Sequence, residues 1–147
     1  MEIVRASAAD IPVLAPLFDQ YRVFYKQPPD LEAATHFLGE RFQRNESVVF
    51  LARKKDLTLG FTQLFPSFSS VSMKYIYILN DLYVAPEYRH QGVGKALLLR
   101  AQRYCQEKGF GGLALETAMD NPAQGLYARM GWVKDTHCFH YFWKAPA

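Results

Sequence analysis

The sequence predicts a mixed α/β fold of the α+β class, in which a central splayed mixed sheet is flanked by about four helices. The first observation is that two segments with apolar residues at helical spacing precede a run of β-branched and aromatic segments. The second is that helical and strand segments alternate in the later part of the chain. The 147 residues, half of them apolar, contain no repeat or linker, so we expect a single domain over residues 1–147.

Two helices are expected after a short strand at residues 2–5. Ser7 and Asp10 mark the start of the first helix, because a serine caps a helix and an acid favours its positive end. Apolar residues then recur at steps of three and four until Pro28-Pro29 ends the helix. Residues 30–44 show the same spacing and predict the second helix.

Three strands are expected in the middle of the chain. Residues 47–53 and 59–65 flank a turn and predict a hairpin, which a polar connection at residues 67–70 joins to a strand over residues 74–84. That strand contains Asn80-Asp81, which are poor strand residues. Either these two residues lie on a face that meets a ligand or the strand bulges there.

The later part of the chain predicts two further helices and several short strands. A helix follows Pro86 and ends at about Lys108, where Gly109 is a suitable cap. A strand over residues 112–117 precedes a helix that ends at Met130, before Gly131. The apolar patterns at residues 132–133 and 136–143 predict the last strands.

Composition narrows the class of partner. No apolar run approaches the roughly 20 residues that span a bilayer, so we expect a cytoplasmic protein with no membrane partner. The formal net charge is +3, but the basic residues are scattered, which favours a small anionic ligand over nucleic acid. The two cysteines and four histidines lack ligand spacing, so no metal is expected.

A glycine turn at the start of the third expected helix has the features of an anion site. Gly92 and Gly94 follow a strand and open a helix, and Arg89 and Lys95 add positive charge. The dinucleotide fingerprint would need a glycine at position 97, and the nucleotide P-loop a serine or threonine at position 96. Neither is present, so the turn alone predicts an anion without naming it.

Around this turn the chain resembles the GNAT superfamily of acetyl-CoA-dependent N-acetyltransferases. Arg89, Gly92 and Gly94 match the Arg/Gln-x-x-Gly-x-Gly/Ala pattern of that family's pyrophosphate loop. The phrase LNDLYVAPEYR precedes the loop, and NPAQGLYARMGW, residues 121–132, is similar to a later family phrase. There is also a faint resemblance to branches that act on small amines or polyamines.

The resemblance implies a single N-acetyltransferase domain that uses acetyl-CoA as its co-substrate. The acetyl group would pass directly to the primary amine of a small amine, a polyamine or a lysine side chain, in a ternary complex. The alternative function is a non-catalytic acyl-CoA-binding module, which would keep the glycine turn but need neither Tyr127 nor Asp81. The oligomeric state is left open, with a homodimer as one possibility.

Three residues are candidates for the chemistry. An attacking amine arrives protonated and needs a carboxylate to remove its proton, and Asp81 is the leading candidate because it lies at the expected irregularity of the long strand. Glu116, at the end of the neighbouring expected strand, is the second candidate. Tyr127 matches the family's general acid in the phrase NPAQGLYARMGW. A phenol suits that role, because it is neutral at pH 7 and can protonate the leaving thiolate.

The resemblance also assigns binding residues. Those assigned to coenzyme A are Leu82, Tyr83, Val84, Arg89, His90, Gln91, Gly92, Val93, Gly94, Lys95, Asn121 and Tyr127. The family's asparagine lies three residues before the alanine of its phrase, a place held here by Asp120, so Asp120 and Asn121 both stay open as contacts of the pantetheine arm. The acceptor amine is assigned to Tyr25, Asp30 and Asp81, since aromatic rings with carboxylates can hold a cation.

Overall fold

A five-stranded mixed sheet forms the centre of the computed structural model, which describes residues 1–147. Its strands lie in the order in which they follow one another in the chain: β1 (Glu2–Arg5), β2 (Val48–Lys54), β3 (Leu57–Ser69), β4 (Lys74–Val84) and β5 (Leu113–Ala114). The first four strands pair antiparallel, and β5 pairs parallel to β4. The predicted mixed sheet is therefore confirmed.

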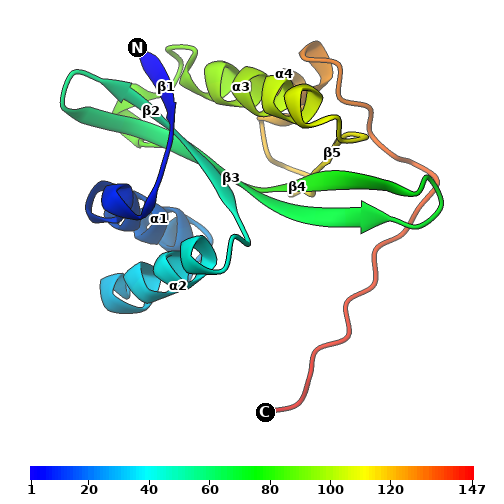
Figure 1. The fold of residues 1–147 in the computed structure, drawn as a ribbon, viewed down its shortest axis with the longest axis horizontal. Coiled ribbons are helices and arrows are strands. Elements are labelled where there is room, and N and C mark those ends of the chain that lie inside the picture. The colour runs from blue at the N-terminus through cyan, green and yellow to red at the C-terminus, as the bar shows by residue number, and fades with distance from the viewer. The chain divides into compact units, whose positions relative to one another are not determined.

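Four helices accompany the sheet, as predicted: α1 (Ile11–Phe24), α2 (Leu31–Gln43), α3 (Val93–Lys108) and α4 (Gln124–Arg129). Figure 1 shows α1 and α2 together on one face of the sheet and α3 on the other. The core on the α1 face is built from apolar side chains of α1, α2, β2 and β3, with Leu14, Leu38 and Phe61 almost fully enclosed. No helix combines the length and apolar composition that crossing a membrane requires.

Local signals in the sequence explain where the helices begin and end. The Ser7 backbone N–H donates to the Asp10 carboxylate at 2.8 Å, within a short 3₁₀ turn that leads into α1. Asp30 caps α2, because its carboxylate accepts the Ala33 N–H at 3.1 Å. Gly109 ends α3 with a left-handed φ of 71°, a conformation that glycine adopts without steric cost.

The chain divides into two compact units, each described by itself: residues 1–116 and residues 117–147. The first unit contains the sheet with α1, α2 and α3, and the second contains α4. The single domain over residues 1–147 stays a prediction.

The bounds of two strands, β3 and β5, differ from the prediction. β3 continues through residues 67–69, which were expected to be a connection, because β4 supplies a ladder partner as far as Ser69↔Lys74. The strand expected over residues 112–117 contracts to Leu113–Ala114, since β5 follows β4 for only that length.

The end of the chain also differs from the expectation. Residues 132–133 and 136–143 form no strand, and residues 133–147 are exposed without regular secondary structure. An alternating apolar pattern describes a half-buried strand, but a strand also needs a neighbour that completes its backbone hydrogen bonds. No ladder partner pairs with these residues, so the pattern alone does not produce a strand.

Candidate functional site

The second half of β4 has one unpaired edge. β5 pairs with β4 only at Tyr77↔Leu113 and Ile78↔Ala114, whereas β3 stays paired as far as Gly60↔Val84. The Ala85 N–H donates to the Leu59 carbonyl at 2.9 Å, so by alternation the backbone groups of Leu82 and Val84 face away from β3. This open edge can accept an extended ligand that carries amides, in the manner of an added strand.

A β-bulge interrupts β4 just before this edge. The pairing with β3 changes from Gln63↔Asp81 to Leu64↔Leu79, which leaves Asn80 as the extra residue. The bulge expected as one alternative at Asn80-Asp81 is therefore confirmed. Beyond the bulge, Asp81 and Tyr83 share the sheet face that carries α1, since alternate residues of a strand point to the same face.

Asp81 is a buried carboxyl held by hydrogen bonds. Its relative exposure is 3 %, and the Gln63 amide donates to Oδ2 while the Asn80 amide donates to Oδ1 at 3.0 Å. The Tyr21 hydroxyl hydrogen-bonds both the Asn80 carbonyl oxygen, at 3.2 Å, and the Asp81 carboxyl. Burial raises the pKa of Asp81, and these three hydrogen bonds oppose part of that rise. A carboxyl of this kind is suited to accept a proton.

An aromatic cluster, formed by Tyr21, Phe24, Tyr25 and Tyr83, lies beside this carboxyl. Ring centroids lie 5.0 Å apart for Tyr21 and Tyr25 and 6.0 Å apart for Tyr21 and Tyr83. The Arg89 guanidinium lies over the rings of Phe24 and Tyr83, at 5.6 and 5.4 Å from their centroids. Tyr25 is 47 % exposed, so the cluster presents an aromatic surface to solvent.

The loop between β4 and α3 has the geometry of an anion site. Gly92 is the N-cap of α3 with a left-handed φ of 82°, and a Cβ built on it would meet no atom within 4 Å. The first backbone hydrogen bond of the helix runs from Ala96 N–H to the Gly92 carbonyl, so the N–H groups of the preceding turn have no partner within the helix. An anion placed there would meet free donors and the positive end of a 16-residue helix.

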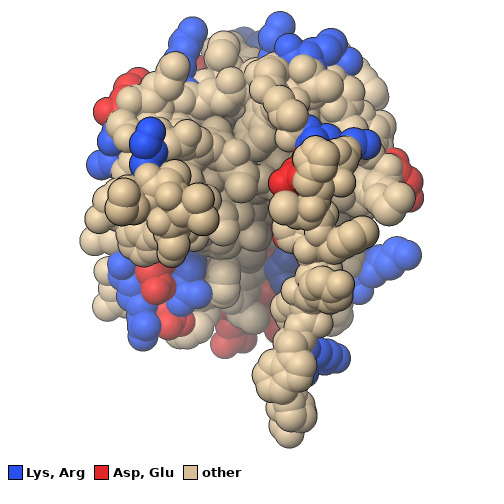
Figure 2. Space-filling view, turned by 90° about the vertical axis from the view of Figure 1, so that its right-hand side faces the viewer, with Lys and Arg blue, Asp and Glu red and all other residues tan.

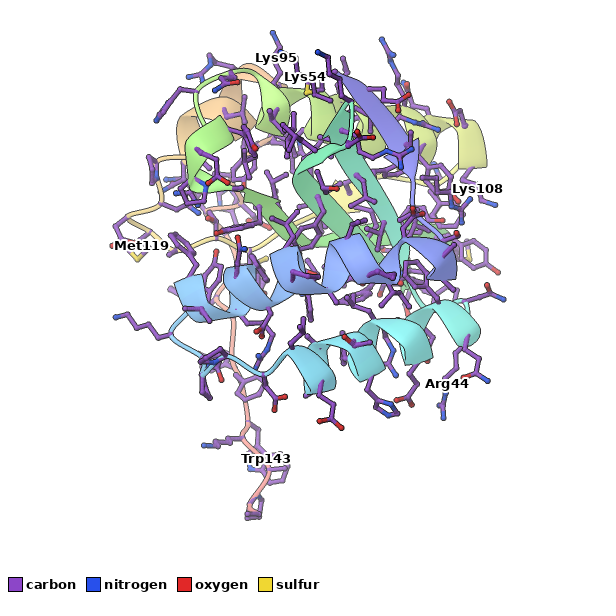
Figure 3. The ribbon with its side chains drawn as sticks, turned by 90° about the vertical axis from the view of Figure 1, so that its left-hand side faces the viewer. Arg44, Lys54, Lys95, Lys108, Met119 and Trp143 are labelled. Atoms are coloured by element: carbon purple, nitrogen blue, oxygen red, sulfur yellow. The ribbon has the colours of Figure 1, made fainter.

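Charged side chains frame this loop in different ways. The Arg89 Nε donates to the Val84 carbonyl at 2.9 Å, which ties the loop back to the end of β4. Lys95 is exposed and Figure 3 labels it at the edge of the first unit, near the start of α3. On the face shown in Figure 2, Lys and Arg lie in several separate places and form no continuous basic stripe.

Two of the other candidate residues lie outside this geometry. Glu116 is exposed and lies two residues beyond the end of β5. Asp30 caps α2, and its own N–H donates to both carboxylate oxygens of Asp19 at 3.1 Å, so it has a structural role in the α1–α2 connection. No three side chains of His, Cys, Asp or Glu come together as a metal-binding group.

Tyr127 and Asn121 lie in the second unit. Asn121 accepts the Ala123 N–H at 2.9 Å, and Tyr127 follows on α4, half-buried. Gly131 has a φ of 89°, and the Trp132 N–H returns to the Tyr127 carbonyl at 3.0 Å. This cap brings the Trp132 ring to 6.0 Å from the Tyr127 ring, measured between centroids. The glycine-aromatic pair after the tyrosine therefore fixes the end of α4 and contacts the tyrosine ring.

Gln63 is the residue of this region that the sequence predictions missed. It is fully buried on β3 and bonds directly to Asp81. Its signal was present, because a glutamine stands in the mostly apolar phrase LGFTQLF, and a buried amide is normally kept for its hydrogen bonds.

An open strand edge followed by an anion loop at a helix start can hold an extended ligand that carries both amides and phosphate groups. The model of the acetyltransferase (GNAT) family matches residues 14–132, and the chain belongs to this family. It is therefore an acetyl-CoA-dependent acetyltransferase, with acetyl-CoA as its co-substrate.

Individual relatives agree with this assignment. The chain is 46 % identical over 148 residues to an uncharacterized N-acetyltransferase, YhfO, of Bacillus subtilis (strain 168), covering 100 % of this chain and 99 % of the relative. A crystal structure of a probable acetyltransferase superposes with a TM-score of 0.93 at 39 % identity, covering 100 % of this chain and 99 % of the other. The aminoglycoside N-acetyltransferase AAC(6')-Iy, solved with CoA, shares the fold with a TM-score of 0.79 at 20 % identity, covering 98 % and 95 %.

Proposed function

We propose that the protein transfers the acetyl group of acetyl-CoA directly to the primary amine of a small amine, a polyamine or a lysine side chain. The observation that carries this proposal is the buried Asp81 carboxyl, whose pKa is raised by burial, next to the open edge of β4. An ammonium group must lose a proton before it can attack a thioester, and a carboxyl with a raised pKa meets that need.

The donor would bind along β4 and the loop after it. The pantetheine arm would hydrogen-bond the backbone groups of Leu82 and the N–H of Val84, and its pyrophosphate would meet the N–H groups of residues 91–95. The left-handed Gly92, with open space where a Cβ would stand, supports a close approach of the phosphate groups to this backbone.

The chemistry would then proceed without a covalent enzyme intermediate. Asp81 would take one N–H proton from the ammonium group, and the freed electron pair on nitrogen would form a bond to the thioester carbon. A backbone N–H of the open β4 edge would stabilise the oxyanion that develops. When the carbon–sulfur bond breaks, Tyr127 would donate its hydroxyl proton to the thiolate of coenzyme A.

The acceptor amine would lie against the aromatic cluster, on the side of β4 that carries Asp81. Tyr25 is its most exposed tyrosine, and an aromatic face attracts a cation within about 6 Å of the ring centroid. The Arg89 guanidinium already lies over Phe24 and Tyr83, so the exposed ring of Tyr25 would meet the substrate. Asp30, as a helix cap, would act on the substrate only through its charge.

The test is release of free coenzyme A from acetyl-CoA across a panel of polyamines, small amines, amino acids, aminoglycosides and lysine peptides. We expect turnover with at least one cationic amine, with mass spectrometry locating the acetyl group on a primary nitrogen. Thermal stabilisation by acetyl-CoA without acetylation of any amine would contradict the proposal and favour the acyl-CoA-binding module.

A further inference from the structure

Gln63 is the buried partner of Asp81. It lies opposite Asp81 in the β3–β4 ladder, its exposure is 0 %, and its Nε2 donates to Asp81 Oδ2. The other end of the same amide, Oε1, is buried without a hydrogen-bond partner. The amide is therefore bonded at one end only, toward the carboxyl.

A half-bonded buried amide is costly. An unpaired buried acceptor costs about 1–3 kcal/mol, and an apolar side chain at this position would avoid that cost. Phe61, two residues earlier on the same face of β3, is also fully buried, so this face of the strand is enclosed. The amide must therefore serve a need that an apolar side chain would not meet.

That need is a change of protonation at the carboxyl. A carboxylate accepts hydrogen bonds only, whereas a protonated carboxyl carries an O–H that must find an acceptor. A half-turn of the Gln63 amide replaces Nε2 by Oε1 on the side of Asp81. Because nothing bonds the far end of the amide, this turn breaks no other hydrogen bond.

We propose that Gln63 is a positioning residue whose amide follows the proton on Asp81, donating to the carboxylate and accepting from the carboxylic acid. The inference rests on the proposed role of Asp81 as the base. In the step concerned, an ammonium N–H bond breaks and an O–H bond forms on Asp81. The electron pair of the broken bond stays on the amine nitrogen, and the new O–H donates to Oε1 of the turned amide.

The other side chains that bond the carboxyl, Asn80 and Tyr21, are less buried than Gln63. Asn80 donates from β4 but is exposed, and Thr62 on β3 donates at 2.8 Å to the backbone carbonyl of Asp81. Tyr21 on α1 is the titratable group that meets the carboxyl. Burial raises the pKa of Asp81 and the hydrogen bonds of Gln63, Asn80 and Tyr21 lower it, without a charged neighbour among the causes.

The experiment compares the wild-type protein with Gln63→Met, which keeps the length of the side chain and removes both hydrogen-bonding ends. The pKa of Asp81 is read from its carboxyl ¹³C resonance in the ligand-free protein. The bond that the amide makes to the charged carboxylate is stronger than the one it would accept from the neutral acid, so we expect the pKa to rise in the variant. The acidic limb of the kcat/KM profile should move to higher pH by the same amount, with the Kd of acetyl-CoA unchanged. Ser47→Ala, which removes another buried side-chain oxygen without a partner, should leave the Asp81 pKa unchanged.

An Asp81 pKa that is the same in Gln63→Met and wild type would overturn the inference. A raised pKa with an unmoved kcat/KM profile would support the contact of the amide with the carboxyl and would contradict Asp81 as the base. A second measurement needs no variant: the side-chain amide ¹⁵N resonance of Gln63 in the wild-type protein should titrate with the Asp81 carboxyl. A resonance that stays constant through that titration would also overturn the inference.

Discussion

The bulge of β4 and the loop that follows β4 are neighbours in the chain, yet they are built from different groups. At the bulge, three side chains hold the Asp81 carboxyl in a buried position. In the loop, the functional groups are backbone N–H groups, exposed by the left-handed turn at Gly92. A side-chain site can change its protonation state, whereas a backbone site offers a fixed array of donors.

This difference predicts which variants should change kcat and which should change the affinity for acetyl-CoA. Groups that exchange a proton in the transition state change kcat when they are removed. Some hydrogen-bond donors bind acetyl-CoA equally well in the ground state and in the transition state. Their removal changes the Kd or KM of acetyl-CoA and leaves kcat nearly constant. Variants of the bulge should therefore slow turnover, and variants of the loop should weaken binding.

Asp81→Asn should give the largest effect. The amide keeps the shape of the side chain but accepts no proton from the ammonium group, so we expect kcat to fall by about 10³-fold. The Kd of acetyl-CoA, measured by calorimetry, should stay within about twofold of wild type, because uniform binding is untouched.

Glu116→Gln is the matched variant for this comparison, since it makes the same chemical change in an exposed residue beyond β5. We expect the fall in kcat to be far smaller than for Asp81→Asn. The reverse order of the two effects would assign the base to Glu116 and would contradict the difference drawn between the buried and the exposed carboxyl.

Tyr127→Phe should give the next largest effect. Phenylalanine keeps the ring contact with Trp132 and loses the hydroxyl proton, so we expect kcat to fall by about 10²-fold. Acceptors should all be affected to a similar degree, because the proton goes to the leaving thiolate. Stopped-flow measurement of thiol release tests this, and an unchanged rate of release would reject Tyr127 as the acid.

The fold was predictable where the signals are local. Ser7 with Asp10 and Gly109 set helix ends through capping and backbone geometry, as predicted. α1 ends at Phe24, four residues before Pro28, so the proline pair does not itself set that end. The length of β3 was not predictable, because the ladder with β4 compensates for its polar end. The strands expected near the end of the chain were wrong for the same reason, since pairing is a property of two segments.

The candidate site divides in a similar way. The loop could be predicted in part from Gly92, because a glycine adopts a left-handed φ without steric cost; the second left-handed residue of the loop, His90 with a φ of 63°, carries no such signal. The bulge could be predicted only as an alternative, from the poor strand residues Asn80-Asp81. Gln63 could not be assigned to Asp81 from the sequence, because the register between β3 and β4 decides which residues lie opposite each other.

Gly92→Ala should weaken binding of acetyl-CoA without a large change in kcat. Alanine meets open space at this position, so the cost comes from the left-handed φ of 82° and not from a collision. In the free variant the loop can relax out of this conformation, and binding must then restore it at a cost of about 1–2 kcal/mol, so we expect the Kd to rise by about 5- to 30-fold. Gly112→Ala is the matched control, because its Cβ also meets nothing within 4 Å but its φ lies outside the left-handed range. Equal Kd values for the two variants would contradict the proposal that the left-handed backbone at Gly92 is needed to bind acetyl-CoA.

The smallest effect concerns stability, and it distinguishes the buried carboxyl from the backbone site. The folded protein binds the proton of Asp81 more tightly than the unfolded chain does, since burial raises the pKa of this carboxyl. Its contribution to stability is therefore fully present below the unfolded pKa of about 3.9 and is lost as the pH rises through the folded pKa. Asp81→Asn has no such loss, so its Tm relative to wild type should increase over that pH window. Gly92→Ala should show a Tm difference from wild type that does not depend on pH. A relative Tm of Asp81→Asn that is constant or decreases with pH would contradict the buried, proton-accepting state of Asp81.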